Sequence, residues 1–183
     1  MDGILMKWIC GFFVCLVLAP FAAAQNAPTV KQAESACGPF DVNFDVKTEG
    51  HQHLLAPAEA GKAQIYVIED WDWRDRGRIN RPTVRVGMDG KWMGADQGDS
   101  FQFFSAVPGR HHLCVSWKQG MGETNNMIAV YGFNAESDQT YYFRATMARG
   151  NSLSHAMILE PLNIDEAQLL LASYPLAHST IKK

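Results

Sequence analysis

The sequence predicts an all-β protein, specifically an antiparallel β-sandwich of about seven or eight strands with one C-terminal helix. Three observations predict this class. Short apolar runs with the two-residue period of strands recur along the chain, and turn-forming dipeptides separate them. The segments between the runs are too short for the crossover helices that join parallel strands. The chain has 183 residues, which is enough for one domain with a sizeable core.

The first strands are predicted from two different hydrophobic patterns. Residues 40–46 alternate apolar and polar side chains, as in a half-buried strand. Residues 63–69 are apolar on both faces, which is typical of a central strand. Residues 47–61 contain glycine and proline and are interpreted as a long loop, and the strand pattern returns at residues 83–88.

Two tight turns follow. Asp89-Gly90 is favoured in type I′ hairpin turns, because both central positions need a positive φ. Pro108-Gly109 fits a type II turn, in which proline presets φ and glycine accepts the left-handed position. A strand over residues 101–107 is predicted to run between the two turns.

The strand after the second turn carries a cysteine on its far face. Leu113, Val115 and Trp117 share one face of this strand, so Cys114 points the opposite way, where a covering segment could reach it. Cys10 and Cys15 lie in the N-terminal segment that export would remove, so the mature protein keeps Cys37 and Cys114. In an exported protein, two cysteines favour pairing, and we predict a disulfide between them. Two separate buried thiols are the alternative. The disulfide would hold the N-terminal segment against the sheet.

The C-terminal third is predicted to contain the last strands and the helix. Asn163 is a potential N-cap, Glu166 completes a capping-box-like start, and Pro175 ends the helix. The aromatic run Tyr141–Phe143 is explained by sheet propensity alone. The remaining strands are predicted at residues 127–133, 140–147 and 157–159.

The N-terminus has the features of a signal peptide. Lys7 precedes an apolar stretch over residues 8–18, and Ala22-Ala23-Ala24 offers a small-residue cleavage pattern, so we expect cleavage after Ala24. The apolar stretch is short for a membrane span, which needs about 20 residues, although an uncleaved anchor is the alternative. We therefore predict a secreted or periplasmic protein without stable membrane insertion after cleavage.

The predicted organisation of the whole chain follows from these assignments. A signal peptide over residues 1–24 precedes a flexible leader at 25–36, which is small and polar. The β-sandwich domain with its helix occupies residues 37–178, and residues 179–183 form a tail. The formal net charge is −3, and this argues against nucleic acid as a partner because phosphate binding needs a clustered basic surface.

The order of these motifs resembles a known family. GKAQIYVIED at residues 61–70 is followed by the DGKxxG hairpin at 89–94, the PGRHHLCVSW turn and strand at 108–117, and TYYFRA at 140–145. Over roughly residues 61–170, the chain is similar to domain of unknown function 2846. The resemblance implies a small β-sandwich, often found behind a bacterial signal peptide or lipoprotein signal. It implies no established activity, so no catalytic residue is carried over.

The charged aromatic segment at residues 69–82 is the predicted recognition surface. Trp71 and Trp73 fall on one side of an extended segment and Arg74 flanks them, a composition found at protein hot spots and sugar-stacking platforms. We therefore predict ligand binding by Trp71, Trp73 and Arg74. The alternative is that both indoles pack beneath the loop as part of a satellite core.

The histidines offer a competing hypothesis of enzymatic function. His51 and His53 would share one face of an extended segment, whereas His111 and His112 would lie on opposite faces of a strand. Neither an HExxH motif nor paired CxxC motifs are present, so we predict no metal, no cofactor and no catalytic residue.

The predicted function is therefore non-enzymatic. We expect a secreted or periplasmic binding or cell-envelope interaction module, whose partner is a protein or glycan of the envelope. The alternative is a periplasmic hydrolase or metal-dependent enzyme that uses loop histidines, including His155, and carboxylates.

Overall fold

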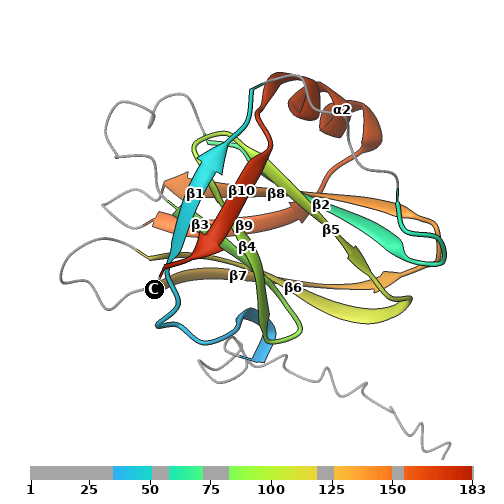
Figure 1. Cartoon of the computed structure of the whole chain (residues 1–183), viewed down its shortest axis with the longest axis horizontal. Helices are drawn as coiled ribbons and strands as arrows, with labels where there is room; N and C mark the ends of the chain where they lie inside the picture. The colour runs from blue at the N-terminus through green and yellow to red at the C-terminus, as the bar shows by residue number, and fades with distance from the viewer. Residues whose placement is uncertain (1–34, 51–57, 72–82, 119–125, 150–154, 183) are drawn as a thin grey trace, which may run out of the picture.

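The computed structural model describes residues 35–50, 58–71, 83–118, 126–149 and 155–182 (Figure 1). These residues form ten strands in three sheets and a C-terminal helix, so the all-β sandwich-like class is confirmed. Two four-stranded sheets pack face to face around the main core, to which Val67, Val84 and Leu113 contribute. A short helical turn at residues 35–37 precedes the first strand.

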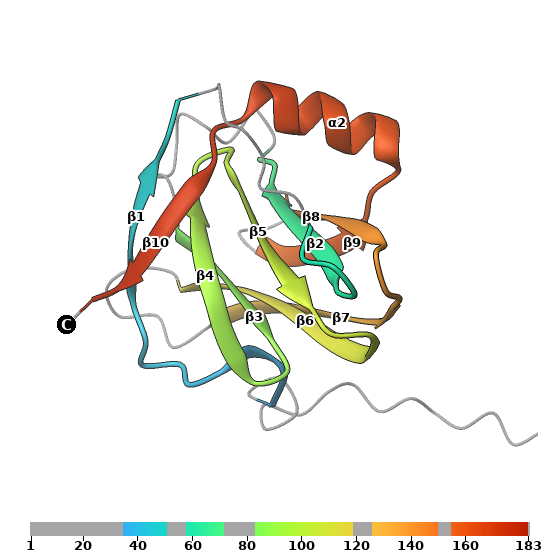
Figure 2. The same ribbon diagram turned by 45° about the vertical axis from the view of Figure 1, so that its right-hand side comes forward.

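The two large sheets each combine strands from distant parts of the chain. In the first sheet the order is β5 (Phe101–Ala106), β2 (Ala63–Glu69), β8 (Thr140–Arg149) and β9 (His155–Pro161). In the second sheet the order is β4 (Lys91–Gln97), β3 (Thr83–Met88), β6 (Gly109–Lys118) and β7 (Asn126–Ala135). The helix α2 (Ile164–Ser173) lies over the outer face of the first sheet (Figures 1 and 2).

One strand pair departs from the predicted antiparallel arrangement. β2 and β8 are parallel, in register from Gln64 opposite Thr140 to Glu69 opposite Ala145. The sequence analysis favoured an antiparallel sandwich over a parallel α/β sheet, because no crossover helix fits between the strands. The chain instead leaves β2 for β3 and β4 in the second sheet, returns to the first sheet as β5, and passes through β6 and β7 of the second sheet before it forms β8. The connection is made of strands, so β2 and β8 form a parallel pair in a sheet whose other pairs are antiparallel.

Two further strands raise the number above the predicted seven or eight. β4 reads KWMGADQ, in which Gly94, Ala95 and Asp96 are its buried residues, so no apolar alternation marks it. β10 (Ala177–Ile181) follows the helix and includes residues predicted as a tail. Both strands are recognised by their pairing partners and not by their own composition.

β10 pairs with β1 (Phe44–Thr48) in a small third sheet that lies beside β4 (Figure 2). Ser179 on β10 accepts a hydrogen bond from the backbone N–H of Ala95, at 2.9 Å from nitrogen to oxygen. β4 is an edge strand of its sheet, and its outward N–H groups need a partner or a cover. The third sheet supplies that cover.

The predicted hairpin turn between β3 and β4 is present. Asp89 and Gly90 have φ values of 52° and 81°, as a type I′ turn requires. Gly109 also has a positive φ, of 139°, at the turn between β5 and β6. The first turn closes the β3–β4 hairpin, whereas the second carries the chain from the first sheet to the second.

The disulfide between Cys37 and Cys114 is present, with the two Cα atoms 5.1 Å apart. Leu113 and Val115 face the main core, while Cys114 faces outward into a separate cluster with Ala36 and Cys37. Residues 35–43 therefore cover the outer face of the second sheet, as the alternation along β6 predicted.

A buried arginine fixes this covering segment to the sheet. Nη1 of Arg85 donates to the carbonyl oxygens of Phe40 and Val42, at 2.9 and 3.0 Å, and Nη2 donates to Oγ of Ser116 at 2.9 Å. Its guanidinium also lies 4.7 Å from the centre of the Trp92 ring. Burial lowers the pKa of Arg85, so these contacts compensate the cost of removing the charge from water.

The helix begins and ends where the sequence predicts. Oδ1 of Asn163 accepts from the backbone N–H of Glu166 at 2.9 Å, which is the expected N-cap. The helix packs on the first sheet through Ala167, in a cluster with Tyr66 and Phe101. Oη of Tyr174 donates to Asp70 at 2.6 Å and anchors the C-terminal end of the helix.

His111 connects the two tight turns. Its Nδ1 lies 2.6 Å from Oδ2 of Asp89, and its Nε2 lies 2.7 Å from the carbonyl oxygen of Val107. Both neighbours are acceptors, so the ring satisfies both contacts only as a doubly protonated imidazolium. Burial lowers the pKa of His111, but the hydrogen bonds to Asp89 and Val107 outweigh burial, and the net pKa is raised.

Replacing Asp89 with asparagine is expected to lower the pKa of His111 and to destabilise the fold by about 1 kcal/mol at pH 6. The carboxylate charge is lost, while asparagine keeps the positive φ and the acceptor for the N–H of His112. Because the pKa is raised in the folded state, this stabilisation is present below pH 6.5 and is lost as the pH rises through the folded pKa. The measurement is an NMR titration of the His111 ring. An Asp41→Asn control should leave it unchanged, and an unaltered titration in Asp89→Asn would contradict the assignment.

Candidate functional site

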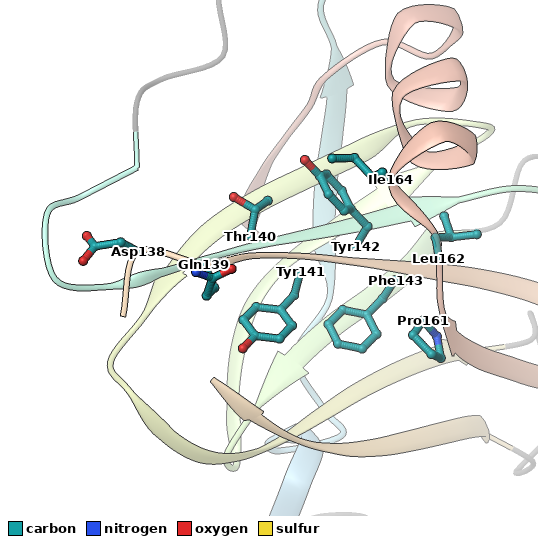
Figure 3. A pocket seen from close by; sticks show the side chains of 9 residues that line it. All are labelled: Asp138, Gln139, Thr140, Tyr141, Tyr142, Phe143, Pro161, Leu162 and Ile164. Carbon is teal, nitrogen blue, oxygen red and sulfur yellow. The ribbon is translucent and has the colours of Figure 1, made fainter. Parts of the chain in front are cut away.

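A surface pocket of about 430 Å³ lies where β8 begins (Figure 3). It is bounded by the first residues of β8, the end of β9 and the start of α2. We call it the β8 pocket. Its lining residues are Asp138, Gln139, Thr140, Tyr141, Tyr142, Phe143, Pro161, Leu162 and Ile164. The volume falls in the range of small-molecule and peptide-binding pockets.

The aromatic residues of the pocket project to both sides of β8. Tyr142 stacks on Tyr66 beneath the helix, with ring centres 5.3 Å apart. Tyr141 points to the opposite side and packs against Phe133, at 5.4 Å. Both tyrosines are partly exposed, whereas Phe143 is buried. The aromatic strand therefore provides a pocket wall in addition to core packing, which sheet propensity alone did not predict.

The backbone of β8 is left open inside the pocket. The pairing of β8 with β9 ends at Phe143 opposite Pro161, and one further bond runs from the N–H of Leu162 to the carbonyl oxygen of Tyr142. The chain then turns away into α2. On the other side, β2 pairs with β8 from Thr140 onward. Residues 139–141 therefore have a partner on the β2 side only, and we call this stretch the open edge.

An acidic side chain marks the outer end of the open edge. Asp138 adopts a positive φ of 61°, and its Oδ1 accepts from the backbone N–H of Gly61 at 2.8 Å. This hydrogen bond lowers the pKa of Asp138, so the exposed carboxylate is ionised near neutral pH. The cation nearest in sequence to Gly61, Lys62, is paired with Glu59. The end of the pocket is therefore negatively charged.

The structure places Trp71 away from any exposed surface. Its side chain is 7% exposed and packs edge-to-face on Trp117, with ring centres 5.7 Å apart. Its backbone N–H donates to Oδ1 of Asp99 at 3.0 Å. The burial of this indole agrees with the alternative interpretation, in which it packs against the core. Trp73 and Arg74, the other predicted contacts, lie outside the described residues.

Two carboxyl groups lie inside the sandwich, and sequence reasoning missed their role. Glu69 and Asp96 are both 0% exposed, on the inward faces of β2 and β4. In the described part of the chain, neither has a hydrogen-bond partner of standard geometry. Burial raises the pKa of Glu69 to about 8, against smaller lowering effects of the Gly98 N–H and Trp71. Burial and the nearby Glu69 raise the pKa of Asp96 well above its ordinary value.

This carboxyl pair is not accessible to a substrate. The pair is surrounded by Trp71, Gln102 and the part of β4 that β10 covers. Trp71 and Gln102 are themselves buried, so they shield the two acids from solvent. The β8 pocket does not include either acid. We interpret the pair as interior groups, of which Glu69 holds its proton at neutral pH, with consequences for stability.

The structure describes only some of the histidines on which the enzymatic hypothesis depends. His111 is engaged with Asp89 and Val107, and His112 is exposed. His51 and His53 lie outside the described residues. Among the residues that the structure does describe, no group of three or more His, Cys, Asp or Glu side chains could hold a metal ion.

Comparison with known proteins provides no relative for the chain. No family model matches it, and no curated protein or solved structure matches it either.

The described part of the chain contains no helix of the length and apolarity that a membrane crossing requires.

Proposed function

We propose that this protein is a non-enzymatic binding module of the secreted or periplasmic compartment, and that its ligand occupies the β8 pocket. The observation that carries this proposal is the pocket itself, where two partly exposed tyrosines and an open strand edge meet an ionised carboxylate. Aromatic rings with a polar rim are the usual composition of protein and glycan binding sites. This site replaces the Trp71 loop as the proposed contact surface.

Three features support the proposed compartment. The first 24 residues have the pattern of a cleavable signal peptide. The disulfide between Cys37 and Cys114 is of the kind that persists in oxidising compartments. The motif order resembles domain of unknown function 2846, whose members often follow a bacterial signal sequence. The expected partner is a protein or glycan of the cell envelope.

Site-directed photocrosslinking tests the proposal. A benzophenone side chain at Ile164, which is 56% exposed and lines the pocket, is expected to form a specific adduct in an envelope extract. The matched control carries the same group at Ile181, which is 61% exposed but lies on β10. Adding Tyr142→Ala should abolish the adduct at position 164. Equal labelling from both positions, or labelling that is insensitive to Tyr142→Ala, would refute the pocket as the binding site.

A further inference from the structure

We infer that the β8 pocket binds an extended peptide carrying a lysine or arginine, which adds to the open edge of β8 as an extra strand. This inference rests on the proposed function and names the ligand of the same site. Three independent features of the pocket lead to it: the direction of the free backbone groups, the placement of side chains on both sides of the edge, and the charge at its outer end.

The backbone of Thr140 points into the open edge. Gln64 on β2 donates to the carbonyl oxygen of Gln139, so the groups of residue 139 face β2. Tyr142 accepts from Leu162 on the β9 side, so the groups of residue 142 face the opposite way. Successive residues of a strand alternate in this respect, and Thr140 therefore directs its N–H and C=O toward the pocket. Pairing with a further strand would satisfy both groups.

The fold itself explains why this edge is open. β9 ends at Pro161, which has no N–H, and the chain then enters α2 after Asn163. The start of β8 thus extends beyond the strand that pairs with the rest of it. An added peptide would continue the path of β9 along residues 139–141, within a pocket that is already shaped by the fold.

Side chains stand on both sides of this path, as strand addition requires. Tyr141 and Phe143 line one side, and Thr140, Tyr142 and Ile164 line the other (Figure 3). A peptide strand presents alternate side chains to the two faces of a sheet. Its apolar residues would therefore contact Tyr141 on one side and Tyr142 or Ile164 on the other. Strand addition typically takes affinity from the backbone and specificity from such side-chain contacts.

The charge at the outer end selects a basic ligand. Asp138 lines the pocket and is exposed and ionised, and the neighbouring Lys62 is already paired with Glu59. A lysine or arginine on the bound peptide would meet this charge, so we expect affinity to fall with rising salt.

The probe is a phage-displayed library of short random peptides, selected on the full-length mature protein. Enriched peptides are synthesised with blocked ends, and their affinity is measured by fluorescence polarisation. We expect enriched sequences to contain lysine or arginine among β-branched or aromatic residues. Asp138→Asn keeps the acceptor for the Gly61 N–H, and it should weaken binding about tenfold and reduce the salt dependence.

Two measurements test the backbone contact directly. Thr140→Pro removes the N–H that faces the pocket, whereas the matched control Thr140→Val keeps it, so binding should weaken about tenfold only with proline. N-methylation of successive peptide residues should alternate between strong loss and little effect, because only every second N–H faces β8. The methylation series needs no protein variant, so it remains decisive even if Thr140→Pro does not fold.

The outcomes separate this inference from the proposed function. No enriched peptide, or enriched peptides without a basic residue, would overturn the inference and leave the crosslinking result at Ile164 to judge the binding module. Peptides that require Tyr142 but show a uniform methylation response would likewise overturn strand addition while supporting the pocket. An alternating methylation pattern, with loss in Asp138→Asn, would support the whole inference.

Discussion

Replacing both Cys37 and Cys114 with alanine is expected to lower the free energy of unfolding by about 4 kcal/mol. The bridge joins residues separated by 77 positions, and in the chain-entropy model closing such a loop removes about 4.5 kcal/mol of unfolded-state entropy. The variant also frees residues 35–43, whose carbonyl groups accept from the buried Arg85. Chemical unfolding monitored by tryptophan fluorescence measures the loss.

The matched control for this experiment is the wild-type protein with its disulfide reduced. Its unfolding midpoint should fall close to that of the double variant, because both lack the same constraint. Oxidised wild type and the double variant with equal midpoints would contradict a stabilising role for the bridge. A large loss confined to the variant would instead point to the packing of the two side chains with Ala36 and Trp92.

The second large effect is expected from the interior acids Glu69 and Asp96. The pKa of Glu69 is raised from 4.5 to about 8, so the folded state holds a proton that the unfolded state releases. Stability is therefore greatest below pH 4.5 with respect to this group, and it falls as the pH rises toward 8 and above. The loss amounts to as much as about 5 kcal/mol, since one pKa unit corresponds to about 1.4 kcal/mol.

Glu69→Gln combined with Asp96→Asn should remove most of this pH dependence. Both replacements are neutral at all pH values and nearly the same shape as the protonated acids. We expect the variant to be more stable than wild type at pH 8 and similar to it at pH 5. The measurement is a series of urea unfolding curves between pH 5 and 8.5. Asp41→Asn, an exposed control, should retain the wild-type slope, and an unchanged slope in the double variant would contradict the prediction.

The pH dependence of this pair can be distinguished from that of His111. Both contributions weaken as the pH rises, but the contribution of His111 is lost only above pH 6.5. Asp89→Asn should change the pH dependence of the free energy of unfolding above pH 6.5. The Glu69→Gln, Asp96→Asn double variant should change that pH dependence from about pH 4.5 upward. Comparing the two variants assigns each part of the stability curve to its own group.

Much of the fold could be predicted from local patterns. Asp89-Gly90 and Pro108-Gly109 specify turns through their own φ preferences. The capping residue Asn163 marks the start of the helix through a contact with Glu166, three residues away. Alternation along β6 placed Cys114 on the outer face. In each case the interacting groups are close in sequence, so composition alone carries the information.

The missed features depend on partners that are distant in sequence. β10 is polar and short, and it is a strand because β1 and the edge of β4 lie beside it. β2 and β8 pair in parallel across 70 residues of chain, most of whose strands belong to the opposite sheet, while β5 returns to pair with the other side of β2. The polar residues around Trp71 in the sequence favour an exposed recognition loop. The burial of Trp71 follows from contact with Trp117, 46 positions later.

The candidate site was present in the sequence only as an aromatic strand. Strand propensity alone accounts for the aromatic run Tyr141–Phe143. The pocket could not be predicted, because it depends on where β9 ends relative to β8. The β class, the β3–β4 hairpin, the second turn and the helix could be predicted from the sequence because they follow from local periodicity and turn chemistry. The cysteine pairing could be predicted because an exported protein with two cysteines favours a disulfide. Only the tertiary structure decided which aromatic residues are buried, which strand edge is open and which acids share the interior. These depend on register and packing between strands that are distant in the chain.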